Sequence, residues 1–159
     1  MSLLVVIDID GTISDATDRF RLAGPAPELN NLSAYLSWVD AVNENMQYDS
    51  KVPGMRDLLR SLKYGGAHCV YITNREEKHR QATEDWLSEN GFPSFEVMMR
   101  EDGSYSEAAD YKGTIIHNLR QVFGFKEVVV IDDDGDGNLE KLCLSKGYTF
   151  LKARSGGGM

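Results

Sequence analysis

From His68 onward, the chain alternates between short apolar runs and helical patterns, and this alternation limits the possible folds more than any other feature. Short runs rich in β-branched residues, without polar alternation, are typical of strands buried on both faces. Strands that alternate with helices form a parallel sheet covered by helices on both sides. The predicted strands are Leu3–Ile7, His68–Ile72, Phe95–Met99, Val128–Ile131 and Tyr148–Leu151. The sequence therefore predicts an α/β fold, a doubly wound parallel sheet of about five strands.

The first strand and the next core helix are separated by a long stretch, residues 13–52. This stretch is too long for an ordinary connection, and it contains one helical pattern, Asn31–Asn45. Ligands of doubly wound sheets bind at the carboxyl ends of the strands. We therefore expect residues 13–52 to form a small helical insert over that end of the sheet. The chain then reads as a single domain, residues 1–154, followed by a flexible glycine-rich tail at 155–159.

The composition of the chain limits its expected partners and cellular location. The formal net charge of −8 opposes binding to nucleic acid unless a local basic patch overrides it, and we expect no stripe of Lys or Arg. No apolar run is long enough to span a membrane, and no charged-then-apolar leader opens the chain, so we predict a cytoplasmic protein without a membrane partner. Cys69 and Cys143 lack zinc-ligand spacing, which favours buried, reduced thiols.

Two carboxylates follow the first predicted strand directly, in the run Asp8-Ile9-Asp10-Gly11-Thr12. A pair of aspartates two residues apart is common on protein surfaces and then has no function. Here the pair stands where a doubly wound sheet places its ligands. Burying two carboxylates without a cation would be costly. The run therefore predicts a functional site that holds positive charge.

Polar residues also follow two other strands. The second strand ends in Thr73-Asn74-Arg75, which alone is most often a helix cap. The fourth ends in Asp132-Asp133-Asp134, with Asp136 nearby. These aspartates match the opening of a calcium-binding EF-hand loop, but that loop needs a preceding helix and a glutamate where this chain has Cys143. Acidic strand ends that face each other indicate a Mg²⁺ site with oxygen ligands instead.

The motifs together resemble the haloacid dehalogenase (HAD) superfamily of phosphatases. That family has DxDGT after the first strand, then Ser or Thr after the second, then a lysine, and an acidic pair after the last core strand. The lysine here is Lys112, near the start of the predicted helix Tyr111–Phe123; a lysine there is otherwise usually solvated. The matching residues are Asp8–Thr12, Thr73, Lys112 and Asp132-Asp133.

The chain is still more similar to the phosphatase domain of phage polynucleotide kinase-phosphatases. The likeness rests on the Thr73-Asn74-Arg75 turn, on Arg80 and Trp86 in the following helix, and on Ile131-Asp132-Asp133. The chain departs from that family at Asp134, where the family has an arginine. It also has no P-loop motif, so we expect no kinase half in this chain.

The resemblance implies a covalent mechanism. Asp8 would attack phosphorus and form an aspartyl-phosphate. Asp10 would protonate the leaving oxygen and then deprotonate the attacking water, which requires an upward shift of its pKa from neighbouring negative charge. Ion-pumping relatives carry Thr at the position of Asp10, so an aspartate favours phosphatases and phosphomutases. Mutases generally need a larger cap than residues 13–52 can build, which favours hydrolysis.

The same resemblance implies how the cofactor and the phosphate are held. Mg²⁺ would be bound by Asp8, the Asp10 backbone carbonyl and Asp132, and Asp133 would orient a water ligand of the metal or Lys112. Thr73 would donate a hydrogen bond to the phosphoryl group, and Lys112 would offset its negative charge. The predicted substrate-binding residues are Thr73, Asn74, Arg75, Arg80 and Lys112.

Three functions fit these residues. The first is a Mg²⁺-dependent phosphomonoesterase acting on a small phosphate ester or a nucleotide. The second is a phosphatase of nucleic-acid ends, for which Arg75 and Arg80 would both face an open site, although the charge of −8 opposes it. The third is a non-catalytic regulator that binds phosphate or metal. The intact Asp8/Asp10 pair argues against the third, because a binder needs no general acid.

Overall fold

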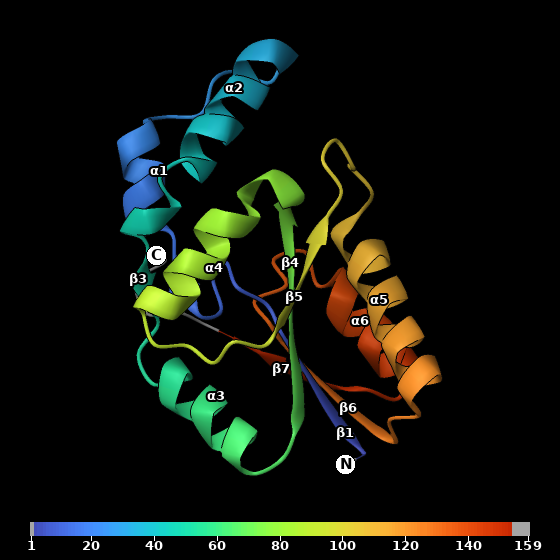
Figure 1. The fold of residues 1–159 in the computed structure, drawn as a ribbon. Helices are drawn as coiled ribbons and strands as arrows, with labels where there is room; N and C mark the ends of the chain where they lie inside the picture. The colour runs from blue at the N-terminus through green and yellow to red at the C-terminus, as the bar shows by residue number, and fades with distance from the viewer. Residues whose placement is uncertain (1, 154–159) are drawn as a thin grey trace.

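Five parallel strands form the centre of the protein in the order β5-β4-β1-β6-β7 (Figure 1). The computed structural model describes residues 2–153, so the predicted tail at 155–159 lies outside the described residues. The predicted doubly wound parallel sheet is confirmed. Its strands are β1 (Leu3–Ile7), β4 (His68–Glu76), β5 (Glu96–Arg100), β6 (Glu127–Asp132) and β7 (Thr149–Lys152).

Helices cover both faces of this sheet and create two apolar layers (Figure 1). Helices α3 (Met55–Tyr64) and α4 (Arg80–Glu89) contribute to one layer, and α5 (Ala108–Phe123) and α6 (Asn138–Lys146) to the other. Successive residues of β1 point to opposite faces: Val5 belongs to the first layer and Val6 to the second. Burial on both faces explains why β1 reads as a continuous apolar run. Cys69 and Cys143 are both buried and free, one in each layer.

The residues between β1 and α3 form a two-stranded hairpin that carries a helical insert (Figure 1). The hairpin pairs β2 (Ser14–Asp15) with β3 (Ser50–Lys51). Between its strands lie α1 (Thr17–Ala23), α2 (Leu32–Asn43) and the 3₁₀ turn η1 (Met46–Tyr48). The Trp38 ring lies 5.8 Å from those of Phe20 and Tyr35, so the two helices pack on an aromatic cluster of their own.

Contacts to the rest of the protein hold the insert both at its base and near its outer end. The indole N–H of Trp86 on α4 donates to the Asp49 carbonyl at 3.0 Å, at the base of the insert. Near the outer end, Lys78 in the 3₁₀ turn η2 (Glu77–His79) pairs with Asp40 on α2 at 3.0 Å. The first contact is buried and the second is exposed, so we expect the base of the insert to be held more firmly than its tip.

Three local features differ from the sequence prediction. Strand β4 continues through Thr73-Asn74-Arg75 to Glu76, with a register shift against β5 after Ile72, so this motif belongs to the strand. Helix α5 begins at Ala108 rather than Tyr111. Helix α1 and the hairpin were not predicted, because segments of two to seven residues show too little periodicity. Among residues 2–153, no helix is long and apolar enough to cross a membrane.

Candidate active site

Most of the predicted site residues meet at the carboxyl end of the sheet, around a pocket of about 390 Å³. Asp8 follows β1 directly, Asp132 ends β6, and Asn74 lies near the end of β4. Lys112 reaches the same pocket from the second turn of α5. These side chains meet because the carboxyl ends of parallel strands all lie at the same end of the sheet. The residues lining the pocket are Asp8, Asp10, Asn74, Ala108, Lys112, Asp132, Asp133, Asp134, Gly135, Asp136 and Leu139.

Asp8 is held by two donors in a buried, acidic setting. The Lys112 ammonium donates to Asp8 Oδ1 at 3.0 Å and to Asp132 Oδ2 at 2.6 Å, and the Thr12 hydroxyl donates to Asp8 Oδ2 at 3.1 Å. Burial raises the pKa of the Asp8 carboxyl well above its ordinary value; Lys112 opposes this, while neighbouring carboxylates add to it. Burial lowers the pKa of Lys112, but Asp8 and Asp132 outweigh burial and hold it above its usual range. Asp8 is therefore oriented firmly, in a setting that favours added positive charge.

Asp133 and Asp134 are adjacent in the acidic loop after β6, but their side chains have different neighbours. Asp133 is half-buried and lies against Gly11, where a Cβ atom would stand 2.2 Å from Asp133 Oδ2. Gly11 also has a φ of 78°, so this close approach requires glycine. Asp134 instead accepts the backbone N–H groups of Leu139 and Glu140 at 3.2 and 2.9 Å, which caps the start of α6.

A metal ion fits the group of carboxylates formed by Asp8, Asp132 and Asp133. Asp8, Asp132 and Asp133 each offer a carboxylate oxygen, and the three oxygens lie within 4.8 Å of one another. Three carboxylates and one ammonium, that of Lys112, leave a net charge of −2 when all are ionised. Burial, with a smaller contribution from Asp132, raises the pKa of Asp133, and Asp8 and Lys112 oppose this shift. Hard oxygen ligands with this charge suit a divalent cation such as Mg²⁺.

Asp10 faces an entirely different set of partners. Arg75 donates to its two oxygens at 3.1 and 2.7 Å, and Arg19 of α1 donates to the same carboxylate. Partial burial raises the pKa of Asp10, but the two guanidinium groups outweigh this and hold the pKa well below its usual range. The upward shift expected from the sequence is therefore wrong for this arrangement, because cations rather than carboxylates surround Asp10.

The insert supplies two residues that the sequence did not single out. Arg19 comes from α1, and Asp49 comes from the end of the insert; both side chains are almost fully buried. Asp49 lies 3.2 Å from Arg19 and 3.5 Å from Arg75. Burial outweighs these guanidinium groups and raises the pKa of Asp49 to about 6. Asp10, Asp49, Arg19 and Arg75 form a cluster with two charges of each sign, and no local sequence signal could pair residues so far apart.

Thr73 is fully buried and is not among the residues that line the pocket; its hydroxyl accepts the Arg75 backbone N–H at 3.2 Å. Arg75 is also buried: besides Asp10, it donates to the Thr83 hydroxyl at 3.0 Å. Arg75 therefore supports Asp10 from β4 and does not project into open solvent. Both residues lie at the end of the second core strand, as the sequence predicts.

The match to a family model identifies the group to which these residues belong. Residues 2–138 match the model described as HAD superfamily, subfamily IIIB (acid phosphatase). The chain belongs to this HAD subfamily. As a member of an acid phosphatase family, it is a phosphoric monoester hydrolase, and the family generally uses a divalent metal. A comparison with curated protein sequences finds no match.

Solved structures share the HAD fold at low sequence identity. The Pnkp1/Rnl/Hen1 complex matches with a TM-score of 0.71 and 18% identity over 98% of this chain, which spans only 47% of the matched chain. A class C acid phosphatase from Bacillus anthracis with tungstate bound matches at 0.64 and 16%, over 98% of this chain and 67% of that one. A haloacid dehalogenase-like hydrolase from Streptococcus pneumoniae matches at 0.65 and 16%, over 94% and 83%.

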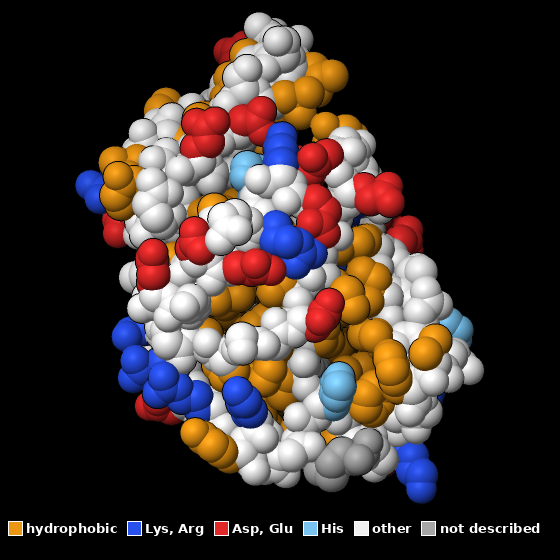
Figure 2. All heavy atoms as spheres, viewed as in Figure 1, with side chains coloured by type: hydrophobic (Ala, Val, Ile, Leu, Met, Phe, Trp, Pro, Cys, Tyr) orange, Lys and Arg blue, Asp and Glu red, His pale blue; other side chains and the backbone are white. Residues whose placement is uncertain are grey.

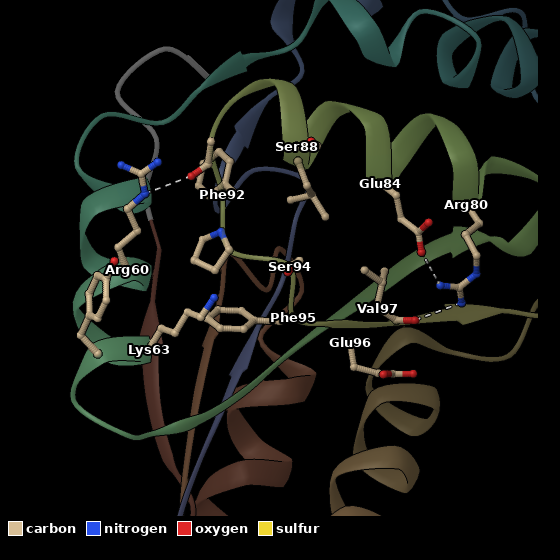
Figure 3. A pocket seen from close by; sticks show the side chains of 14 residues that line it. Arg60, Lys63, Arg80, Glu84, Ser88, Phe92, Ser94, Phe95, Glu96 and Val97 are labelled. Carbon is tan, nitrogen blue, oxygen red and sulfur yellow. Dashed lines mark hydrogen bonds and ion pairs between the residues drawn. The ribbon is translucent and has the colours of Figure 1, made fainter.

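The prediction that Arg80 binds the substrate requires a correction, because this side chain does not line the pocket around Asp8. Its guanidinium group donates to Glu77 at 2.7 Å, to Glu84 at 3.1 Å and to the Val97 carbonyl at 3.0 Å. Figure 3 shows it at one end of a second pocket of about 680 Å³, along the edge strand β5. The expectation that Arg75 and Arg80 share one opening is therefore wrong. Spacing along the chain could not reveal it, since the 3₁₀ turn η2 intervenes.

Proposed function

We propose that this protein is a Mg²⁺-dependent phosphomonoesterase that forms an aspartyl-phosphate on Asp8 and acts on a small phosphate ester or nucleotide. The observation that carries the proposal is the setting of Asp8, which Lys112 and Thr12 orient within a cluster of three carboxylates. A carboxylate held in one orientation by two donors is suited to attack the phosphorus atom of an ester bound in the pocket.

In the first step, a carboxylate oxygen of Asp8 forms a bond to phosphorus while the bond from phosphorus to the ester oxygen breaks. The proton that the leaving oxygen needs comes from the carboxyl group of Asp10. Lys112 and Thr73 stabilise negative charge on the phosphoryl group. Asp8, Asp132 and Asp133 would hold Mg²⁺, which would supply a Lewis acid for the phosphoryl oxygens.

In the second step, water attacks phosphorus, the bond between phosphorus and Asp8 breaks, and inorganic phosphate leaves. The carboxylate of Asp10 accepts the water proton, which returns the residue to its starting state. Arg19 and Arg75 favour the ionised form of Asp10, so the acid role in the first step requires Asp10 to carry a proton against the effect of these two cations. Substrates whose leaving group needs little protonation should react with less help from Asp10.

The test is steady-state hydrolysis of an aryl phosphate with Mg²⁺, with excess EDTA, and after Mg²⁺ is restored. We expect activity to be lost on chelation and recovered on Mg²⁺ addition. Full activity in excess EDTA would exclude the metal role. A panel of nucleotides and sugar phosphates, compared by kcat/KM, would then rank substrate classes.

A second candidate, a phosphatase of nucleic-acid ends, gains support from one surface. Arg56, Arg60 and Lys63 lie at i, i+4 and i+7 on α3, and Figure 2 shows basic side chains gathered over this helix. The expectation that no basic stripe exists is therefore wrong. The structural neighbour described as the Pnkp1/Rnl/Hen1 RNA repair complex adds to the case, at 16% identity over 44% of that chain. The charge of −8 and the carboxylates Glu84 and Glu96 in the adjacent pocket oppose it.

The two candidates differ in their dependence on salt. We compare kcat/KM for a 3′-phosphorylated oligonucleotide and a mononucleotide at two salt concentrations, in wild type and in the pair Arg60→Ala/Lys63→Ala. Each neutralised phosphate would contribute a slope of about −0.7 in log affinity for a single strand. We expect a shallow slope and no effect of the pair, as for the control pair Lys141→Ala/Lys146→Ala on α6. An oligonucleotide preference that salt or the α3 pair abolishes would promote the second candidate.

A further inference from the structure

Arg100, at the end of β5, is a buried cation that forms no ion pair within the described part of the chain, although Glu76 is its register partner on β4. Only 6% of the residue is exposed. Its Nη1 donates to the Ser106 hydroxyl at 3.1 Å, and its guanidinium carbon lies 4.5 Å from the centre of the Tyr111 ring. Neutral partners of this kind hold a guanidinium in position without forming an ion pair.

The other two donor atoms of Arg100 contact Asn74, which lines the pocket around Asp8. Both Nε and Nη2 donate to Asn74 Oδ1, at 3.2 and 3.1 Å. A carboxamide that presents its oxygen to a cation must turn its NH₂ group the other way. In the described part of the chain, no hydrogen bond occupies Asn74 Nδ2, and Asn74 lines the pocket beside Asp8 and Lys112.

We propose that Arg100 is a positioning residue that fixes the Asn74 amide as a donor to a tetrahedral oxyanion, the phosphoryl group of the substrate or inorganic phosphate, in the catalytic pocket. The proposal rests on the phosphatase function proposed above. Two hydrogen bonds from one guanidinium set the amide orientation, and the charge of Arg100 polarises the amide toward an anion. A phosphoryl oxyanion bound to the Asn74 amide would also place negative charge on the Asn74 side of Arg100.

The test measures binding of inorganic phosphate, and separately of tungstate, by calorimetry in the presence of Mg²⁺. Arg100→Met keeps an unbranched chain about as long as the aliphatic stem of arginine but removes every donor. We expect its Kd for phosphate to rise by roughly tenfold, since a hydrogen bond that involves charge is lost. We expect Asn74→Ala to match it. Arg100→Lys retains the charge without the paired donors and should fall between wild type and Arg100→Met.

The double variant separates positioning from a merely structural effect. If Arg100 acts through Asn74, Arg100→Met should weaken phosphate binding no further once Asn74→Ala is present. The matched control is Arg120→Met, because Arg120 also lies over a tyrosine ring, 5.7 Å from Tyr148, but donates to the Phe125 carbonyl away from the pocket. We expect its Kd to stay within about twofold of wild type, as is typical of changes distant from a binding site.

Three outcomes would overturn the inference: an unchanged Kd in Arg100→Met, additive losses in the double variant, or no detectable oxyanion binding by wild type. Thermal unfolding of each variant shows whether it is folded. The binding assay needs no turnover, so it is independent of whether wild type hydrolyses any ester. Loss of hydrolysis with phosphate binding intact would count against the proposed function and leave the Arg100 inference standing. With turnover, the expected signature is a higher KM and a higher inhibition constant for phosphate.

Discussion

Asp8 and Asp10 stand two residues apart, yet the two ends of the motif have opposite surroundings. Asp8 belongs to the sheet: Lys112 and Thr12 hold it beside Asp132, and burial raises its pKa. Asp10 belongs to the boundary with the insert, where Arg19 and Arg75 hold its pKa well below the usual range despite burial. The chain turns sharply after Asp10, with Gly11 at a φ of 78° and a bridge from Asp10 to Ser14.

The difference shows that one motif can serve two electrostatic regions. The sheet region gathers excess negative charge and suits a cation, whereas the insert region is balanced within itself by two acids and two bases. The proposed nucleophile and the proposed proton carrier thus have their partners in different parts of the fold. Changes in the sheet region should act on the metal and the covalent step, and changes in the insert region on proton transfer and folding.

The largest effect is expected at the sheet end of the motif. Asp8→Asn should abolish turnover, because an amide cannot form the acyl-phosphate in the proposed mechanism. The measurement is steady-state hydrolysis of an aryl phosphate with saturating Mg²⁺, with thermal unfolding as a check on folding. Activity like that of wild type would contradict the covalent mechanism and the assignment of different roles to Asp8 and Asp10.

Asp10→Asn should lower kcat/KM by roughly 10²–10⁴-fold on an alkyl phosphate, the range typical of a lost general acid. The loss should be smaller on an aryl phosphate, whose leaving group needs little protonation. The control is Asp18→Asn, an exposed carboxylate on α1 that pairs only with Arg21 among the described residues, and it should leave both rates unchanged. Equal losses on the two substrates would mean that Asp10 does not transfer the proton.

Substitutions of Asp132 and Asp136, two aspartates near the end of β6, should differ in their effect on the Mg²⁺ concentration needed for activity. Asp132→Ala should raise the Mg²⁺ concentration needed for half-maximal activity by at least about tenfold, because it removes one of three clustered carboxylates. Asp136→Ala is the matched control: its carboxylate accepts the Asn138 N–H at 3.0 Å and is not part of the cluster. Similar shifts in both variants would contradict the assigned metal site.

The smallest effect concerns stability in the insert region. Asp49 has a folded-state pKa of about 6, raised mainly by burial from an ordinary value of 3.8. The folded state therefore binds more protons than the unfolded state between these values, and this contribution to stability is lost as pH rises from about 4 to 6. Asp49→Asn removes that dependence.

The unfolding free energy of wild type minus that of Asp49→Asn should thus fall between pH 4 and pH 7, by at most about 3 kcal/mol. Urea titrations of both proteins at the two pH values provide the measurement. A difference that instead grows with pH would show that Arg19 and Arg75 outweigh burial and keep Asp49 ionised in the folded protein.

The sequence alone determined the parallel sheet and the meeting of Asp8 and Asp132 at its carboxyl end, whereas Lys112 was expected there only from the resemblance to the HAD family. Continuous apolar runs of this length, alternating with helical patterns, form strands buried on both faces, and parallel strands present their carboxyl ends together. The acidic residues that follow those runs must therefore meet. The surroundings of Asp8 were predictable for this reason, since its partners come from neighbouring core strands and one helix.

Only the tertiary structure decided which cations reach Asp10, where Arg80 points and what holds Asn74. Arg75 contacts Asp10 across 65 residues of sequence, and Arg100 contacts Asn74 across 26, so no local periodicity connects either pair. Short elements such as η2 and the β2–β3 hairpin set these approaches, and they are too brief to leave a pattern. Burial and contact geometry then fix the direction of each pKa shift, because desolvation and Coulomb energy depend on distances that exist only in the folded chain.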